Sequence, residues 1–311
     1  MNEENEPQNE NFKCGMVSIV GRPNTGKSTL LNSIIGEKIA IVSPVPQTTR
    51  QRIRGMYNSD KGQIIFIDTP GLVMGKDKLD KLLQKASYGT LSEVDCIIHL
   101  VDANEQTGKE ERAIVERINA VKVPVVLGLN KVDRNGKYAD QYISLWEQIK
   151  GKKITEVPFF SILPLSGKTE FNIDKLIEIL FEYLPKGPAL YAADTISDTP
   201  QKLVIADIIR EKFLNILKQE VPHSLAVRID SIDESRKRLV SIKATILVER
   251  DSQKEIVIGK GGERLKEVGT LARMELEELL EKKVYLETFV KMQKNWRDDP
   301  ASLDALGYNM F

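Results

Sequence analysis

Residues 21–28 read Gly-Arg-Pro-Asn-Thr-Gly-Lys-Ser and decide the fold. They match G-x-x-x-x-G-K-[ST], a loop whose glycines let backbone N–H groups turn inward around phosphates. The loop follows the β-branched run 17–20 and opens an amphipathic stretch near Lys27. This order predicts a phosphate-binding loop at a helix N-terminus, where the helix dipole favours an anion. We assign to the nucleotide site all eight residues, Gly21, Arg22, Pro23, Asn24, Thr25, Gly26, Lys27 and Ser28.

Around this loop the chain alternates short apolar runs with amphipathic stretches as far as residue 184. The runs predict strands at 17–20, 63–68, 96–102, 123–130 and 159–165, and the stretches predict helices at 27–35, 110–119 and 172–183. Few positions in the runs are polar, as expected for parallel strands covered on both faces. The alternation predicts a doubly wound α/β domain.

A break rich in Pro and Gly near residues 185–200 separates a second region. Beyond it we predict a helix at 202–220, strands at 225–231 and 238–249, two short helices around a glycine loop, and a strand at 283–291. That order predicts a small α+β domain. The predicted division is a disordered acidic tail (1–13), a nucleotide-binding domain (14–186), a linker (187–200), the small α+β domain (201–297) and a C-terminal tail (298–311).

Two further motifs end predicted strands of the first domain. In the first, Asp68-Thr69-Pro70-Gly71, an Asp can hold Mg²⁺ through water while the Gly71 N–H contacts the γ-phosphate. With Lys27 on the β- and γ-phosphates and the Ser28 hydroxyl on Mg²⁺, this completes a phosphate and metal site. Without the phosphate loop the same four residues predict only a turn.

The second motif, Asn130-Lys131-Val132-Asp133, selects the base. The Asp133 carboxylate can accept two hydrogen bonds from the N1–H and the exocyclic amine of guanine. Adenine offers no donor at N1, so it would leave Asp133 desolvated and unpaired, and sites built on such bonds discriminate strongly. We expect Asn130 to tie the base edge to the phosphate loop and the Lys131 stem to lie over the ring. Three ordered motifs predict a GTPase and argue against an ATP-dependent kinase.

Residues 256–262 read Ile-Val-Ile-Gly-Lys-Gly-Gly and form a G-x-x-G loop between two helical stretches. In KH domains this loop clamps the backbone of four nucleotides. A helix-capping turn is the alternative, but the surrounding element order favours the KH interpretation. Basic residues slightly outnumber acidic ones between 201 and 297, which permits a polyanion partner without requiring one. We expect Ile256 and Val257 to help form an apolar floor for bases, Arg273 to extend the basic face, and RNA to contact Ile258, Gly259, Lys260, Gly261, Gly262, Arg264 and Lys266.

Composition excludes several classes. The apolar runs are too short to span a bilayer, and two cysteines cannot build a disulfide framework. The polar start of the chain, residues 1–11, has no apolar run of the kind found in secretory signals, so we expect a cytoplasmic protein. Cys96 is interpreted as buried packing and His99 as a core histidine inside a strand, so we expect neither to be a metal ligand.

Residues 16–310 resemble the Era GTPases, a bacterial family that joins a GTPase domain to a KH domain of type II. The residues that carry the resemblance are 21–28, Pro46-Gln47-Thr48-Thr49-Arg50, 68–71, 130–133 and the glycine loop near 260. The resemblance implies that Thr48 and Thr49 lie in a mobile first switch segment, with Thr49 reaching Mg²⁺ when GTP is bound. It also implies a partner, the 3′ end of small-subunit ribosomal RNA, and a role in assembling that subunit, in a monomer that also associates peripherally with the inner face of the cell membrane.

The chain departs from the family pattern at two places. Thr25 stands where the family has an apolar residue, but the position contributes mainly backbone, so we expect little change. The loop that backs the guanine begins Ser-Ala in the family and reads Ser166-Gly167-Lys168 here. Gly167 keeps the N–H that could contact the guanine oxygen. We include all three residues in the nucleotide site.

The position after Gly71 is Leu72, where Ras-like enzymes carry a glutamine that orients the attacking water. An apolar side chain cannot do this, so we expect slow hydrolysis. Related GTPases with an apolar residue here use K⁺ held partly by a phosphate-loop asparagine, which resembles Asn24. Our hypothesis is that K⁺, held partly by Asn24, supplies positive charge in the transition state. The alternative interpretation is that Asn24 is only a turn residue, suited to the backbone geometry of the loop. The predicted catalytic residues are Lys27, Asn24, Thr49 and Gly71.

Two hypotheses for the function remain open at the level of sequence. In the favoured hypothesis, GTP orders the Thr48-Thr49 segment and residues 68–71, and hydrolysis releases them and changes access of RNA to the glycine loop. In the other, the C-terminal module docks a protein or a membrane instead of RNA.

Overall fold

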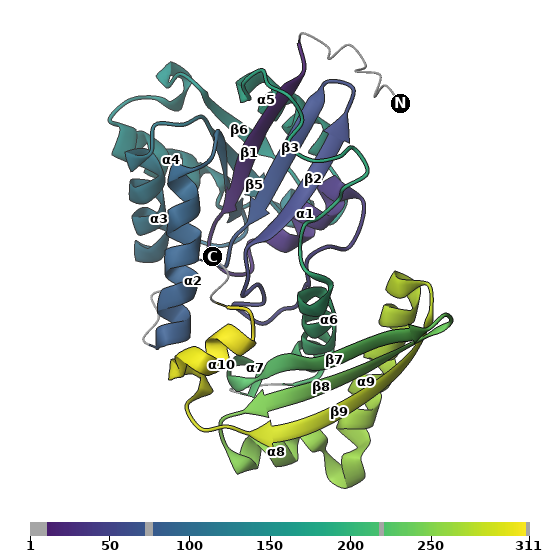
Figure 1. The fold of residues 1–311 in the computed structure, drawn as a ribbon. Coiled ribbons are helices and arrows are strands. Elements are labelled where there is room, and N and C mark those ends of the chain that lie inside the picture. Colours follow the sequence, from purple (N-terminus) through teal and green to yellow (C-terminus); the bar gives the residue numbers. More distant parts are fainter. Residues whose placement is uncertain (1–10, 72–76, 218–220, 309–311) are drawn as a thin grey trace, which may run out of the picture. The chain divides into compact units, whose positions relative to one another are not determined.

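The computed structural model describes residues 11–71, 77–217 and 221–308 (Figure 1). They fall into two compact units. The first comprises Met1–Ala40, Arg52–Met74 and Gln84–Asp198, and the second comprises Ile41–Gln51, Gly75–Leu83 and Thr199–Phe311. The division after Asp198 lies inside the linker predicted at 187–200. The sequence did not predict that residues 41–51 and 77–83 belong to the unit formed by the C-terminal part of the chain.

The first unit is built on a six-stranded sheet with the strand order β2-β3-β1-β4-β5-β6. All neighbouring strands are parallel except β2, which runs antiparallel to β3. The strands are β1 (Lys13–Val20), β2 (Ile53–Ser59), β3 (Gly62–Asp68), β4 (Cys96–Asp102), β5 (Val125–Asn130) and β6 (Phe160–Pro164). The predicted α/β fold is confirmed. Strand β2 was missed because it is only partly buried, unlike the parallel strands.

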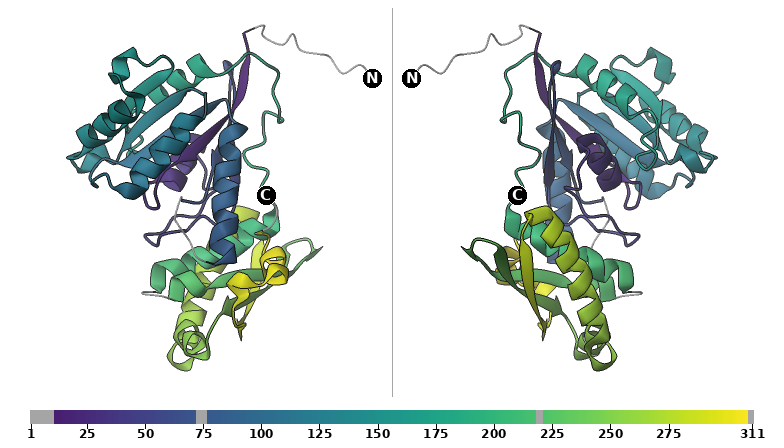
Figure 2. Two further views of the ribbon diagram at one scale, coloured as in Figure 1. Left: turned by 90° about the vertical axis from the view of Figure 1, so that its left-hand side faces the viewer. Right: turned by 90° about the vertical axis from the view of Figure 1, so that its right-hand side faces the viewer.

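Helices cover both faces of this sheet (Figure 2). One face packs against α1 (Lys27–Ile35) and α5 (Ile173–Tyr183), and the other packs against α3 (Lys109–Ala120) and α4 (Ala139–Lys150). The sequence prediction missed α4. The residues of α2 (Lys78–Gly89) are shared between the two units, with the division after Leu83.

The parallel strands place the predicted motifs at one edge of the sheet. The phosphate loop follows β1, Asp68 ends β3, Asp102 ends β4 and Asn130 ends β5. The carboxyl ends of parallel strands lie side by side, and in open α/β sheets ligands bind at that edge. Topology alone therefore gathers residues that are more than a hundred positions apart in the chain.

The segment predicted as the linker runs beside the edge strand β2 within the first unit. The Met56 backbone N–H donates to the Ile196 carbonyl at 3.0 Å, and the Asn58 side-chain amide donates to the Ala193 carbonyl at 3.0 Å. These bonds occupy polar groups that an edge strand would otherwise present to other chains.

The second unit contains a three-stranded sheet, β7-β8-β9, in which β8 is antiparallel to β7 and parallel to β9. Its apolar core joins the sheet to α6 and α9. The predicted order of elements is confirmed, although α9 has 18 residues and is not short, and residues 218–220 of the predicted helix lie outside the described chain. The elements are α6 (Gln201–Ile216), α7 (Val221–Ser224), β7 (Ala226–Arg236), β8 (Leu239–Val248), α8 (Asp251–Ile258), α9 (Glu263–Leu280), β9 (Lys283–Met292) and α10 (Pro300–Ala305).

Within the described ranges, no helix is both long enough and apolar enough to cross a membrane. The predicted tail 1–13 lies mostly outside those ranges.

Candidate nucleotide site and glycine-loop surface

The phosphate loop has a backbone that requires its glycines. A Cβ on Gly21 would lie 2.1 Å from the Leu100 carbonyl oxygen, and one on Gly26 would lie 2.4 Å from the Asn130 amide nitrogen. Gly26 also has a φ of +98°, which disfavours any side chain. Asn24 adopts a left-handed φ of 62° and is exposed. The loop is therefore packed closely against β4 and against the base-selecting motif.

Lys27 is buried at the start of α1, and its ammonium group bonds to backbone carbonyls of the phosphate loop. The Nζ donates to the carbonyl of Gly21 at 3.1 Å and to that of Arg22 at 2.9 Å. Burial lowers the pKa of Lys27 to about 8, although the nearby Asp68 carboxylate favours the charged form. The ammonium group lies where an anion held by the loop would meet it.

Ser28 and Asp68 lie together beside the loop. The Ser28 hydroxyl donates to Asp68 Oδ2 at 2.7 Å, and Asp68 is fully buried at the end of β3. A hydroxyl and a carboxylate are the hard oxygen ligands that Mg²⁺ prefers, so the pair fits the predicted metal site. Thr69 donates to the Ile19 carbonyl at 3.3 Å, and the Pro70 carbonyl accepts from Ser87 at 2.8 Å. These contacts fix the turn that follows β3.

The motif that ends at Gly71 lies directly against the phosphate loop. A Cβ on Gly71 would come within 3.0 Å of the Pro23 ring and backbone. This proximity brings together the two segments predicted to contact the γ-phosphate. Leu72, the basis for predicting slow hydrolysis, lies outside the described residues.

Asn130 joins three segments of the site. Its amide nitrogen donates to the Thr25 carbonyl at 2.7 Å, and its Oδ1 accepts from the Gly167 N–H at 3.0 Å. The structure thus brings together the phosphate loop, the base-selecting motif and the loop predicted to back the guanine. The Gly167 N–H donates to Asn130 in this structure, and its contact with the guanine oxygen stays a prediction.

Lys131 adds a second link between the base-selecting motif and the phosphate loop. Its Nζ donates to the Asn24 carbonyl at 2.6 Å and pairs with Asp102 Oδ2 at 2.7 Å. Burial alone would raise the pKa of Asp102, but hydrogen bonds from Lys131 and Asn104 outweigh it and lower that pKa. Sequence reasoning missed Asp102 and Asn104, although Asp102 ends a strand at the same sheet edge as Asp68 and Asn130.

Asp133 lies in the short turn Val132–Arg134, and its side chain is exposed. The Val132 N–H donates to the Leu165 carbonyl at 3.4 Å, which places this turn beside the 166–168 loop. The Ser166 hydroxyl accepts from the Thr169 N–H at 3.2 Å, and Lys168 is exposed. A Cβ on Gly167 would approach the Leu30 backbone at 3.1 Å, so packing against α1 favours glycine there.

The predicted switch residues Thr48 and Thr49 belong to the second unit. Thr49 is buried, and the Thr48 hydroxyl donates to the Val45 carbonyl at 2.6 Å. The role of Thr49 as a magnesium ligand stays a prediction.

The glycine loop of the second unit lies between α8 and α9. Gly259, Gly261 and Gly262 all have positive φ values, of 75°, 61° and 83°. Lys260 and Lys266 are exposed, and Arg264 donates to the Ile256 carbonyl. The predicted apolar floor is wrong for Val257, which is fully buried in the core because it faces the sheet. Ile256 is exposed and Ile258 half-buried, so only these two remain accessible.

His99 is confirmed as a core histidine. It is fully buried in β4, and each ring nitrogen has a hydrogen-bond partner. Cys96 is likewise fully buried.

Comparisons with known proteins match both halves of this description. A family model described as a 50S ribosome-binding GTPase matches residues 16–131, and a KH domain model matches residues 220–297. A crystal structure of an Aquifex aeolicus Era variant bound to GDP and AlF4⁻ is 39% identical, covers 96% of this chain and 99% of its own, and superposes with a TM-score of 0.88. The chain belongs to the Era family of GTPases.

A second Era structure, in complex with MgGDPNP and nucleotides 1506–1542 of 16S ribosomal RNA, is 38% identical with the same coverages and TM-score. The Era membership confirms the resemblance inferred from the motifs, the P-loop GTPase fold and the C-terminal KH domain.

Proposed function

We propose that this Era-family protein binds GTP and GDP together with Mg²⁺ at the carboxyl edge of the first sheet and hydrolyses GTP slowly. The observation that carries the proposal is Asn130, whose amide joins the phosphate loop at Thr25 to the guanine-backing loop at Gly167. The purine base and the phosphates are the two ends of one nucleotide, and different loops of the protein bind them. A side chain that links these two loops therefore joins them into a single nucleotide site.

The main predicted residues have the following roles in this scheme. Backbone N–H groups of the loop 21–28 cradle the phosphates, and Lys27 neutralises the β- and γ-phosphates. Bound Mg²⁺ neutralises charge on the same phosphates, with Ser28, Asp68 and Thr49 as its proposed protein partners. The Gly71 N–H contacts the γ-phosphate, and Asp133 reads the guanine edge.

The base assignment is tested by Asp133→Asn. The amide replaces one acceptor oxygen with a donor, so affinity should shift from guanine towards xanthine nucleotides by about 100-fold or more. Competition of GTP and XTP for a fluorescent nucleotide measures this shift. Asp140→Asn, an exposed position on α4, is the matched control. Unchanged GTP affinity in Asp133→Asn would refute the assignment.

We also propose that K⁺ assists hydrolysis through Asn24. The exposed, left-handed Asn24 is compatible with a cation ligand, and Leu72 supplies no polar group to the attacking water. Turnover measured in KCl should exceed that in NaCl at equal ionic strength, and Asn24→Ala should reduce the difference. Equal rates in the two salts would exclude the role of K⁺.

We infer that the KH domain binds the 3′ end of small-subunit ribosomal RNA and that the protein assists assembly of that subunit. The related Era structure holds nucleotides 1506–1542 of 16S ribosomal RNA. Here the exposed Lys260 and Lys266 and the left-handed glycines 261 and 262 form a cationic turn suited to a phosphate backbone. We propose a cytoplasmic monomer, with peripheral association at the inner face of the membrane as a further property.

Crosslinking in cells followed by sequencing of the bound RNA tests the RNA proposal directly. Enrichment of the 3′ end of the small-subunit RNA, reduced in Lys260→Glu, is the expected result. Binding that depends weakly on salt and survives Lys260→Glu would instead favour docking of a protein or a membrane.

We propose that nucleotide state reaches the KH unit through residues 41–51, which the structure assigns to that unit. The buried Arg210 of α6 donates to the carbonyls of Thr48 at 2.6 Å and Gln47 at 3.1 Å. The buried Arg50 donates to the Leu225 carbonyl at 2.8 Å. A nucleotide that recruits Thr49 has to reorganise this segment, and so acts on its bonds to the KH unit.

RNA affinity in the presence of GTP, GDP and no nucleotide tests this coupling. We expect a dependence on nucleotide that Arg210→Met reduces, because methionine cannot donate to the two carbonyls. Equal RNA affinity in all three states would refute the switch model.

A further inference from the structure

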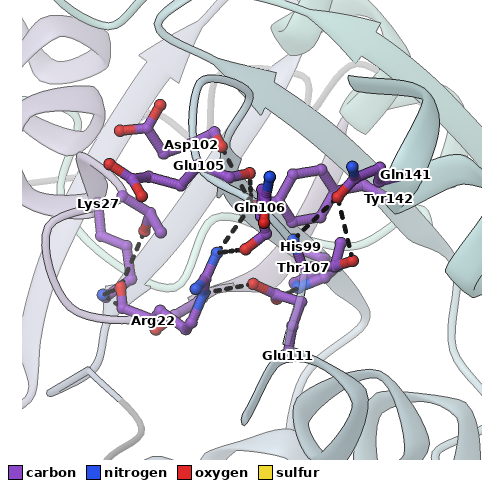
Figure 3. A network of polar contacts seen from close by, with 12 residues as sticks. Arg22, Lys27, His99, Asp102, Glu105, Gln106, Thr107, Glu111, Gln141 and Tyr142 are labelled. Atoms are coloured by element: carbon purple, nitrogen blue, oxygen red, sulfur yellow. Dashed lines mark hydrogen bonds and ion pairs between the residues drawn. The ribbon is translucent and has the colours of Figure 1, made fainter. Parts of the chain in front are cut away.

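Arg22 is part of the phosphate loop, yet its side chain contacts α3, α4 and the segment just before α3 (Figure 3). Its Nε pairs with Glu111 Oε2 at 2.6 Å. Its Nη2 donates to the Tyr142 hydroxyl at 2.7 Å and to the Gln106 carbonyl at 3.2 Å. These three partners, one ion pair and two hydrogen bonds, hold the guanidinium in position.

Glu111 is fully buried and uses its second oxygen for a different partner. Its Oε1 lies 2.8 Å from His99 Nε2, and the Trp146 indole N–H donates to His99 Nδ1 at 3.1 Å. An indole N–H can only donate, so Nδ1 of His99 accepts and carries no proton. His99 therefore carries its ring proton on Nε2, and this N–H donates a hydrogen bond to Glu111 Oε1.

Opposing effects act on the Glu111 carboxylate. Burial alone would raise its pKa, but His99 and Arg22 more than offset this and lower it. A buried ion pair of this kind adds little net stability compared with apolar residues, whereas removing one partner strands the other charge. The pair thus specifies where Arg22 must lie more than it stabilises the fold.

The position of Arg22 matters because its carbonyl organises the loop. That carbonyl accepts from Lys27 Nζ at 2.9 Å and from the Thr25 hydroxyl at 3.0 Å. A shift of the Arg22 backbone would move both the lysine that faces the phosphates and the residue bonded to Asn130. A path of direct contacts therefore leads from Trp146 through His99, Glu111 and Arg22 to Lys27.

We propose that Glu111, held by His99, is a positioning residue for the phosphate loop and acts on bound phosphates through Arg22. This inference rests on the proposed nucleotide function. Neither Glu111 nor His99 contacts nucleotide in this scheme; they set the geometry of the groups that do. Displacement of such groups by about 1 Å is enough to cost on the order of 100-fold in a reaction.

The test is Glu111→Gln, whose uncharged amide would present a donor to either Arg22 or His99. We expect GDP to bind about 10- to 100-fold more weakly and the KM for GTP to rise accordingly, because the loop loses its anchor. Guanosine, which has no phosphates, should bind as it does to the wild type. Glu116→Gln on the same helix is the control, since Glu116 forms an exposed pair with Arg112.

Two variants of His99 keep the test informative if Glu111→Gln folds poorly. In His99→Gln the amide can still accept from Trp146 and donate to Glu111, so GDP affinity should stay near the wild-type value. In His99→Leu both bonds are lost, so GDP affinity should fall while guanosine affinity is retained.

The outcomes separate this inference from the function on which it rests. Wild-type protein that fails to bind GDP would overturn the nucleotide function itself. Wild-type protein that binds GDP, with Glu111→Gln and His99→Leu binding it equally well, would overturn the positioning role. Equal loss of GDP and guanosine affinity in these variants would also overturn it, because a general weakening of the fold does not distinguish phosphates from base.

Discussion

The nucleotide site and the glycine loop of the KH unit both rely on glycines, but they are held in different ways. At the nucleotide site, side chains from separate motifs bond to one another, as Asn130 does to Thr25 and Gly167 and Ser28 does to Asp68. At the glycine loop, backbone angles fix the shape, and the cationic Lys260 is exposed. The first arrangement should fail abruptly when one bond is removed, and the second should weaken gradually with charge.

The largest expected effect comes from Asn130→Ala. The substitution removes both bonds and leaves the buried Thr25 carbonyl and Gly167 N–H without their partner, at a cost of about 1–3 kcal/mol for each group. We expect GDP affinity to fall at least 30-fold, measured by titration calorimetry. Asn119→Ala, on α3, should leave affinity unchanged. A loss of less than threefold in Asn130→Ala would mean that the loops hold their positions independently.

A smaller effect is expected for Lys260→Glu on RNA binding. Reversing one exposed charge beside a phosphate should weaken binding about 10-fold and lower the slope of log affinity against log salt by about one. Lys237→Glu, in the exposed turn between β7 and β8, changes the same charge away from the loop and is the control. If both variants lose affinity equally, the loop is not the contact site and only the overall charge matters.

Sequence alone sufficed where a motif has one physical solution. The strand β4 and the helix α1 were predicted with their observed bounds, because a buried parallel strand and a helix opened by Gly26-Lys27 leave clear patterns. The cluster of Lys27, Asp68 and Asn130 could be predicted too, since parallel strands bring their carboxyl ends to one edge.

The parts that were missed depend on contacts between segments distant in the chain. Nothing near Arg22 in the sequence indicates Glu111 as its partner. The sequence around Arg210 likewise does not predict its bonds to the carbonyls of Gln47 and Thr48. The sequence suggested that Val257 would face a ligand, whereas packing turns it into the core. The sequence pattern of an apolar side chain in a short helix is the same whether the side chain faces a core or a binding groove.

Two glycines of the glycine loop, Gly259 and Gly261, should differ in how well they tolerate alanine. Gly259 has φ 75° and ψ 171°, a region open essentially to glycine, and a Cβ there would lie 2.9 Å from the Arg264 Cβ. Gly261 has φ 61° and ψ 16°, with open space around it. We expect Gly259→Ala to lower the free energy of unfolding by about 2 kcal/mol or more and Gly261→Ala by about 1 kcal/mol. Urea denaturation measures both, and equal costs would show that backbone shape is not what holds the loop.

The smallest effect is a pH dependence, in which a buried carboxylate beside the nucleotide site is compared with a half-buried one near the C-terminal end of α9. The Glu111 pKa is lowered in the folded protein, despite burial, by His99 and Arg22, so its ionised form contributes stability that is complete above the unfolded pKa of about 4.3. That contribution disappears as pH falls through the folded pKa.

The difference in unfolding free energy between wild type and Glu111→Gln should therefore shrink below about pH 4.3, with a slope of no more than about 1.4 kcal/mol per pH unit. The Glu277 pKa is also lowered, chiefly by the Val284 N–H, but its side chain is only half-buried, so Glu277→Gln should show a weaker trend. Urea denaturation of the three proteins between pH 3.5 and about pH 7 measures this. A difference for Glu111→Gln that stays constant or widens towards low pH would contradict an ionised Glu111 in the folded protein, and with it the charge that anchors Arg22.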